Sequence, residues 1–170
     1  MKVIFLDIDG VLATNKEYSI NRIKFRKKHP EAERLKIPYP YNKGCVEIFN
    51  EIITLVDPYI VLSSDWREHF NLSEMDEIFK FNGIIKSPQD FTDTDGVSFG
   101  NMVRNRAYQI GKYINQHPEI TRWVAIDDMD MRPYMKITNE DENMIVTGDN
   151  EGIKQLGIKN KIIKKLNFEL

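Results

Sequence analysis

Hydrophobic residues along the chain follow two alternating patterns. Short apolar runs that resemble strands occupy residues 2–6, 59–62, 122–126 and 144–147. Between or after these runs, apolar residues recur every three or four positions, which is the spacing of one face of a helix. Strands that alternate with helices favour an α/β fold with a mostly parallel sheet, because parallel neighbours need crossover connections.

Four helices are predicted from this spacing. The helix at residues 43–56 has an apolar face made by Cys45, Phe49, Ile52, Ile53 and Val56. The helix at residues 99–116 has an apolar face made by Val103, Ala107, Ile110 and Ile114. An Asp-Pro and a His-Pro pair end these two helices, because the residue before proline avoids helical geometry. Shorter helices are predicted at about 73–80 and 158–168.

Two stretches do not fit this alternation. Residues 13–42 are longer than a usual connection between a strand and a helix, so we expect a small insertion with structure of its own. This insertion carries a run of cations without an intervening acid: Arg22, Lys24, Arg26, Lys27 and Lys28. Residues 87–98 are polar and contain Pro88, Asp90, Asp95 and Gly96, which predicts a surface loop.

Composition narrows the class of protein. A chain of 170 residues, with 41% hydrophobic and 29% charged residues, fits one globular domain spanning residues 1–170. The net charge of -2 gives no overall attraction to nucleic acid, so any basic surface must be local. The single cysteine, Cys45, lies in an apolar helical pattern and is predicted to be a buried structural thiol. Without a disulfide or an apolar N-terminal segment, we expect a cytoplasmic protein that does not enter membranes.

The first apolar run delivers two carboxylates, Asp7 and Asp9, just before Gly10. Side chains two apart on a strand share a face, so both carboxylates are predicted to point the same way. Like charges this close resist joint ionisation unless a cation or a shared proton relieves them. The pair therefore predicts metal-assisted chemistry, although Asp-Gly is also a common turn signal.

Further polar side chains follow two other predicted strands. Ser63 and Ser64 end the run at 59–62, where a hydroxyl and backbone N–H groups can bind phosphate oxygens. Asp127 and Asp128 end the run at 122–126. In open α/β sheets ligands bind outside the carboxyl ends of the strands, so these side chains should gather there. Oxygen ligands beside a phosphate favour Mg²⁺, and the set is equipped for phosphoryl transfer.

These motifs resemble those of the haloacid dehalogenase (HAD) superfamily of phosphatases. The first family motif is matched by Asp7-Ile-Asp-Gly-Val11, the second by Ser63, and the fourth by Asp127 and Asp128. The run Leu-Ser-Ser-Asp-Trp-Arg at residues 62–67 also resembles a signature of the HAD domains associated with RNA-repair (Swiss Army Knife) proteins. The resemblance implies a Rossmann-like three-layer sandwich with a minimal cap.

The resemblance also implies roles for these residues. Asp7 would be the nucleophile that forms an aspartyl-phosphate, and Asp9 would protonate the leaving group and then activate water. Asp7, the main-chain carbonyl of Asp9 and Asp127 would hold Mg²⁺, with Asp128 as a ligand or as its support. A second acid in the first motif favours a phosphatase over a dehalogenase.

The third family motif, normally a lysine, has no obvious match. On the helix at 99–116, Arg106 lies nearer the centre of the apolar stripe than Arg104, whereas Lys112 faces the opposite side. Arg106 is therefore our first choice for a phosphate-binding cation, and it matches an arginine of the RNA-repair-like subgroup. Arg104 and Lys86 remain alternatives.

The insertion bears on the substrate. The aromatic residues Tyr18, Phe25, Tyr39 and Tyr41 lie among its cations, and two interpretations stay open: they stack bases, or they anchor the insertion to the core. Arg26 and Lys27 are candidate substrate contacts near the site, as are Trp66 and Arg67. Trp66 is equally compatible with packing beneath its loop.

A small cap suggests an open site that admits a polymeric substrate. The leading hypothesis is a Mg²⁺-dependent phosphomonoesterase that acts on polynucleotide ends such as a 3′-phosphate. The alternatives are a phosphatase of a small nucleotide or metabolite, and a catalytically silent domain that binds nucleic acid or regulates another protein. The expected partner is therefore a phosphorylated substrate, with nucleic acid as the leading class.

Overall fold

The strands form one parallel sheet in the computed structural model, which describes residues 1–94, 98–135 and 141–167. Across the described residues the strand order is β3-β2-β1-β4-β5, with every neighbouring pair parallel. Their bounds are Lys2–Leu6 (β1), Tyr59–Leu62 (β2), Asp90–Phe91 (β3), Arg122–Asp127 (β4) and Met144–Val146 (β5). The predicted α/β class with a parallel sheet is confirmed.

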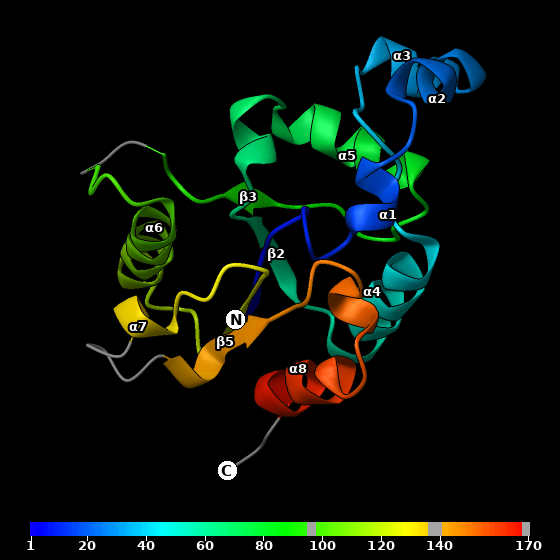
Figure 1. The fold of residues 1–170 in the computed structure, drawn as a ribbon. Helices are drawn as coiled ribbons and strands as arrows, with labels where there is room; N and C mark the ends of the chain where they lie inside the picture. The colour runs from blue at the N-terminus through cyan, green and yellow to red at the C-terminus, as the bar shows by residue number, and fades with distance from the viewer. Residues whose placement is uncertain (95–97, 136–140, 168–170) are drawn as a thin grey trace.

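Helices cover both faces of this sheet (Figure 1). The α-helices are Asn15–Tyr18 (α1), Arg22–Lys28 (α2), Pro30–Arg34 (α3), Lys43–Val56 (α4), Leu72–Phe81 (α5), Met102–Gln116 (α6), Arg132–Met135 (α7) and Ile158–Asn167 (α8). Short 3-10 turns occupy Asp65–Glu68 (η1), Asp141–Asn143 (η3) and Gly152–Lys154 (η4). Helices α6 and α7 lie on one side of the sheet and α4 and α8 on the other, which gives the expected three layers.

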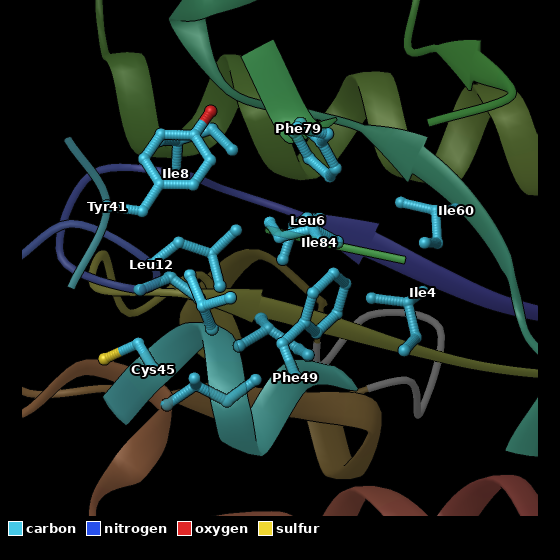
Figure 2. Close-up of a cluster of buried hydrophobic side chains, with 14 of the residues drawn as sticks. Ile4, Leu6, Ile8, Leu12, Tyr41, Cys45, Phe49, Ile60, Phe79 and Ile84 are labelled. Carbon is cyan, nitrogen blue, oxygen red and sulfur yellow. The ribbon is translucent and has the colours of Figure 1, made fainter. Parts of the chain in front are cut away.

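Alternation along β1 divides the core between these two sides. Ile4 and Leu6 belong to the buried cluster that includes Phe49 of α4 (Figure 2). Val3 and Phe5 belong to the cluster on the α6 side. There the ring of Phe5 makes edge-to-face contacts with the rings of Tyr113 and Trp123. The central strand is therefore buried on both faces, which explains why it reads as a continuous apolar run.

Most predicted elements have the expected position. The strands at 2–6 and 59–62 and the helix at 43–56 match the structure residue for residue. Helix α6 begins three residues later than predicted, because Gly100 has a positive φ of 67° and the side chain of Asn101 caps the helix by accepting from the Arg104 N–H. The last residue of the helix predicted at 158–168 lies outside the described residues.

The prediction of a loop at 87–98 is wrong in one respect. Asp90 and Phe91 form the edge strand β3, paired with Val61 and Leu62 of β2. A strand of two residues is too short to show an alternating pattern, and Asp90 is polar, so the sequence carries little signal of a strand here. Asp95 and Gly96 of the same predicted loop lie outside the described residues.

Residues 13–42 contain the three short helices α1, α2 and α3. Thr14 and Glu17 form a capping box at the start of α1, and the Asn21 side chain caps α2 by accepting from the Lys24 N–H. Pro30 occupies the first turn of α3, where its missing N–H costs no helical hydrogen bond. The expected structure within this insertion is therefore present as short, individually capped turns.

The cysteine prediction is also confirmed. Cys45 is fully buried at the start of α4, and its thiol donates to the carbonyl of Glu151 at 3.4 Å. Burial raises the pKa of this thiol. In the part of the chain that the structure describes, none of the helices combines the length and apolar character needed to cross a membrane.

Candidate active site

The strand order places the end of β1 between the ends of β2 and β4. Beyond the strand, the Asp7 N–H donates to the carbonyl of Ile126 at 3.0 Å. The Ser63 N–H donates to the carbonyl of Leu6 at 2.9 Å. These main-chain bonds extend the ladder by one step and hold the residues that follow the strands side by side. The gathering of Asp7, Ser63 and Asp127 at one edge of the sheet thus follows from the topology.

Three carboxylates meet at this edge. Asp7, Asp127 and Asp128 each offer an oxygen within 4.8 Å of the others. Asp7 Oδ1 accepts from the Ile8 N–H at 2.8 Å, and Asp127 Oδ1 accepts from the Met129 N–H at 2.9 Å. The backbone after each strand therefore fixes the orientation of its own carboxylate. The second oxygen of both Asp7 and Asp127 is turned toward the same point.

Arg106 occupies that point. Its Nη1 lies 2.8 Å from Asp7 Oδ2 and 2.8 Å from Asp127 Oδ2, and its Nη2 lies 2.7 Å from Asp65 Oδ1. Of the three candidate cations from the sequence, only Arg106 reaches the cluster. Arg104 lies over the ring of Phe99, and Lys86 pairs with Asp57, which precedes β2 and so lies at the opposite edge of the sheet from Ser63.

The cluster carries more negative than positive charge. Burial, reinforced by the charge of Asp7, raises the pKa of Asp127 to about 8 despite the opposing effect of Arg106. Burial and Asp7 also raise the pKa of Asp128. One guanidinium among three carboxylates leaves an excess of two negative charges when all three are ionised. A hard divalent cation such as Mg²⁺ fits this donor set, because it prefers carboxylate oxygens and matches the excess charge.

Gly10 allows the close approach of this cluster to the loop after β1. Its φ is 71°, and a side-chain Cβ here would lie 2.4 Å from the Cβ of Asp128. Its carbonyl accepts from Thr147 Oγ1 at 2.8 Å, and its N–H donates to the hydroxyl of Tyr18. The sequence gives no signal that Tyr18 and Thr147 support this loop, since neither lies in a motif that carries chemistry.

Asp9 occupies a separate position from the three clustered carboxylates. Its Oδ1 accepts from the Tyr39 hydroxyl at 2.6 Å, and the Trp66 indole N–H lies 3.3 and 3.2 Å from its two oxygens. Burial raises the pKa of Asp9, although the hydrogen bond from Tyr39 acts in the opposite direction. The resemblance implies that Asp9 would bind a metal through its main-chain carbonyl. Its side chain faces the insertion, where it accepts from Tyr39.

A pocket of about 750 Å³ opens beside Asp9. The insertion supplies one wall, with Arg22, Lys36 and Tyr39, and the segment after β2 supplies the other, with Trp66 and Phe70. Trp66 is 4% exposed and contacts the rings of Tyr39, Tyr41 and Phe70, so it mainly holds Asp9 and the pocket wall in place.

The remaining candidates after β2 lie in one tight turn. Ser63 is buried next to the main chain of β1, and Ser64 Oγ caps η1 by accepting from the Trp66 N–H at 3.5 Å. Arg67 Nη1 donates to the carbonyls of Ser63 at 2.6 Å and Ser64 at 2.5 Å, and its Nη2 donates to Gln109 at 2.8 Å. The structure therefore places Arg67 as a support of the turn that carries both serines.

The cations and rings of the insertion face different surroundings. Arg26 donates to the main-chain carbonyls of Lys36 and Ile37, whereas Lys27 is exposed to solvent. The four aromatic residues Tyr18, Phe25, Tyr39 and Tyr41 pack on or within the large core cluster. Burial thus supports the interpretation in which the rings anchor the insertion, and it leaves little ring surface for stacking bases.

Comparison with known proteins finds a match to one family model. The family described as the HAD domain in Swiss Army Knife RNA repair proteins matches residues 3–156. The match covers β1 from its second residue, the strands β2 to β5, and all of the residues described above as clustered at the sheet edge. Neither a curated protein nor a solved structure gives a significant match to the chain.

Proposed function

Because the chain belongs to the family of HAD domains in Swiss Army Knife RNA repair proteins, we propose that it is a Mg²⁺-dependent phosphomonoesterase. Its proposed substrates are polynucleotide ends such as a 3′-phosphate. One observation carries the proposal: Asp7 lies in a buried cluster with Asp127, Asp128 and Arg106, while Asp9 lines the adjoining pocket. In this arrangement the phosphate would lie at the buried cluster, and its leaving group would lie in the adjoining pocket.

In the first step an oxygen of Asp7 attacks phosphorus, and the bond from phosphorus to the leaving oxygen breaks. Arg106 and the Ile8 N–H orient the Asp7 carboxylate for this attack. Asp9 gives its proton to the leaving oxygen. The products of this step are the alcohol and a phosphate bonded to Asp7.

In the second step Asp9, now a carboxylate, takes a proton from a water molecule. The water oxygen attacks phosphorus, the bond from phosphorus to Asp7 breaks, and inorganic phosphate forms. Tyr39 and Trp66 hold Asp9 in one position through both steps, which suits a group that must first donate and then accept a proton. We assign the turn of Ser63 and Ser64 to the phosphate oxygens, because Ser63 lies beside the end of β1 at the same edge of the sheet as Asp7.

Asp7, Asp127 and Asp128 are the side chains that would hold Mg²⁺, with the main-chain carbonyl of Asp9 as a further ligand. When bound, the metal would neutralise negative charge that the carboxylates and the phosphate bring together. Arg106 supplies part of the same neutralisation from the protein itself.

A substrate panel tests the proposal. The purified protein is offered 3′-phosphorylated and 5′-phosphorylated oligonucleotides, mononucleotides and sugar phosphates, each with Mg²⁺ and with a chelator, and released phosphate is measured. We expect Mg²⁺-dependent release that is fastest from an oligonucleotide end. Preference for the small compounds would instead support a metabolite phosphatase. No release from any phosphoester would support the silent domain and remove the enzyme hypothesis.

A further inference from the structure

The pocket beside Asp9 carries positive charge that the proposed hydrolysis does not use. Arg22, Arg34 and Lys36 all line it. Arg34 pairs with Glu77 of α5. Among the described residues, Arg22 and Lys36 have no ion-pair partner, although they face a pocket that also contains acids.

The acids of this pocket are already engaged with other groups. Asp65 accepts from Arg106, and Glu74 accepts from the Asn71 N–H at 2.9 Å as part of a helix cap. Asp9 accepts from Tyr39 and Trp66. The charges of Arg22 and Lys36 are therefore available to a ligand that enters the pocket.

Contacts with neighbouring residues hold Arg22 and Lys36 in place. The guanidinium of Arg22 lies 5.6 Å from the centre of the Tyr39 ring, and Tyr39 itself holds Asp9. Lys36 has a left-handed backbone with φ of 56°, and its carbonyl accepts from Arg26. Lysine rarely adopts this conformation by itself, so the surrounding loop holds Lys36 there.

The chemistry of Asp9 decides what enters this pocket. A general acid must reach the leaving oxygen, so the group bonded to that oxygen must lie in the pocket that the acid lines. We infer that the leaving group bears a second phosphate, which Arg22 and Lys36 bind, and that the smallest good substrate is a nucleoside 3′,5′-bisphosphate. Arginine and lysine are the side chains best suited to phosphate oxygens.

This inference rests on the proposed function and narrows it. At a phosphorylated polynucleotide end, one sugar carries both the terminal phosphate and the neighbouring phosphodiester. A nucleoside 3′,5′-bisphosphate has the same two groups on one sugar. Pro38 and Phe70 are partly exposed in the pocket and offer apolar surface to a nucleoside. A sugar bisphosphate would share the charge but would not use this surface.

The test compares substrates that differ by one phosphate. kcat/KM is measured for a nucleoside 3′,5′-bisphosphate, the matching 3′- and 5′-monophosphates, and fructose 1,6-bisphosphate. The wild type is compared with Arg22→Gln, with Lys36→Asn, which keeps a residue tolerant of positive φ, and with the double variant. The control is Lys28→Gln, because Lys28 is exposed on α2 but does not line the pocket.

We expect the wild type to prefer the nucleoside bisphosphate over the monophosphate about tenfold or more, which is the effect of one good phosphate contact. In the double variant, kcat/KM should fall about tenfold more on the bisphosphate than on the monophosphate, so the preference is lost, whereas Lys28→Gln should keep the preference. Raised salt should reduce the preference in the wild type, because the second contact is electrostatic. Which phosphate is released identifies the end that the site accepts.

Equal use of mono- and bisphosphates by the wild type would overturn the inference and leave the phosphatase proposal intact. So would an equal loss on both substrates in the variants, or a preference for fructose 1,6-bisphosphate. If no compound released phosphate, the proposed function would fail, and binding would still test the pocket. Calorimetry of the Asp7→Asn protein should then show tighter binding of the bisphosphate, and equal binding of both nucleotides would refute the inference.

Discussion

Arg106 shows how one side chain organises the residues of the site. A buried guanidinium that bridges Asp7 and Asp127 is stable because each carboxylate replaces part of the water that the guanidinium has lost. Although burial lowers the pKa of Arg106, the nearby carboxylates outweigh this effect and raise it, so the guanidinium stays charged. The arginine is thus a permanent cation at the place where a phosphate would add negative charge.

Asp7→Asn should abolish phosphate release without unfolding the protein. The amide oxygen still accepts from the Ile8 N–H, but an amide is not a nucleophile toward phosphorus. We expect at least a ~10³-fold loss of kcat. The metal-free protein should stay folded with little net change in stability, because the variant removes one of three clustered carboxylates but also the oxygen that accepts from Arg106 Nη1. Phosphate release and thermal unfolding measure the two effects, and near-normal turnover would exclude Asp7 as the nucleophile.

Gly10→Ala should damage the site through the backbone. The new Cβ would lie 2.4 Å from the Cβ of Asp128 at a position whose φ is 71°. The matched control is Gly83→Ala, where φ is 80° but no heavy atom lies within 4 Å of the new Cβ. We expect the control to cost ~1 kcal/mol from φ alone and Gly10→Ala to cost ~2–4 kcal/mol, measured by urea unfolding. Equal costs would show that Asp128 moves away freely.

Sequence alone predicts the helices and strands that have a regular hydrophobic pattern and clear signals at their ends. The strand at 2–6 and the helix at 43–56 are long, apolar and clearly bounded, so their pattern matches the structure. Helical geometry places Arg106 near the buried face of its helix, and the resemblance to the RNA-repair-like subgroup points to the same residue. Strand β3 was missed because its pairing depends on β2, which is a contact between distant segments that a local pattern does not contain.

The hydrogen bonds of the insertion were also beyond local patterns. Tyr39 reaches Asp9 across thirty positions of sequence, and Arg26 binds carbonyls that follow a separate helix. The basic run at 22–28 looks uniform in the sequence, yet its members have different surroundings in space. Only the three-dimensional arrangement separates Arg22, which lines the pocket, from Arg26, which supports the loop, and Lys27, which faces solvent.

Arg26→Ala should therefore loosen the insertion as a unit. The carbonyls of Lys36 and Ile37 lose their donor, and Ile37 is fully buried, so we expect a cost of ~1–3 kcal/mol. Hydrogen exchange should speed up in residues 22–41 and remain slow in β1. Lys27→Ala is the matched control and should change stability by less than ~0.5 kcal/mol, because Lys27 is exposed. Similar exchange in both variants would argue against a bracing role for Arg26.

At the scale of the whole molecule, the acidic cluster links stability to pH and to metal. The pKa of Asp127 is about 8 in the folded protein, against 3.8 for an ordinary aspartate. Between these values the folded state binds more protons than the unfolded state, so the metal-free protein should lose stability as pH rises from about 4 to about 8. A bound divalent cation favours the ionised carboxylates and should oppose this loss.

Mg²⁺ should therefore stabilise the protein more at pH 8 than at pH 5. At a metal concentration one hundred times its Kd, the expected gain is ~2.7 kcal/mol, and competition with protons reduces it at the lower pH. Thermal unfolding with Mg²⁺ or a chelator measures the difference. Asp127→Asn should remove most of the Mg²⁺ effect, whereas Asp57→Asn, which changes an exposed acid paired with Lys86, should preserve it. A Mg²⁺ effect that survives in Asp127→Asn would place the stabilising ion elsewhere on the surface, and its loss in Asp57→Asn would show that removing any single acid is enough.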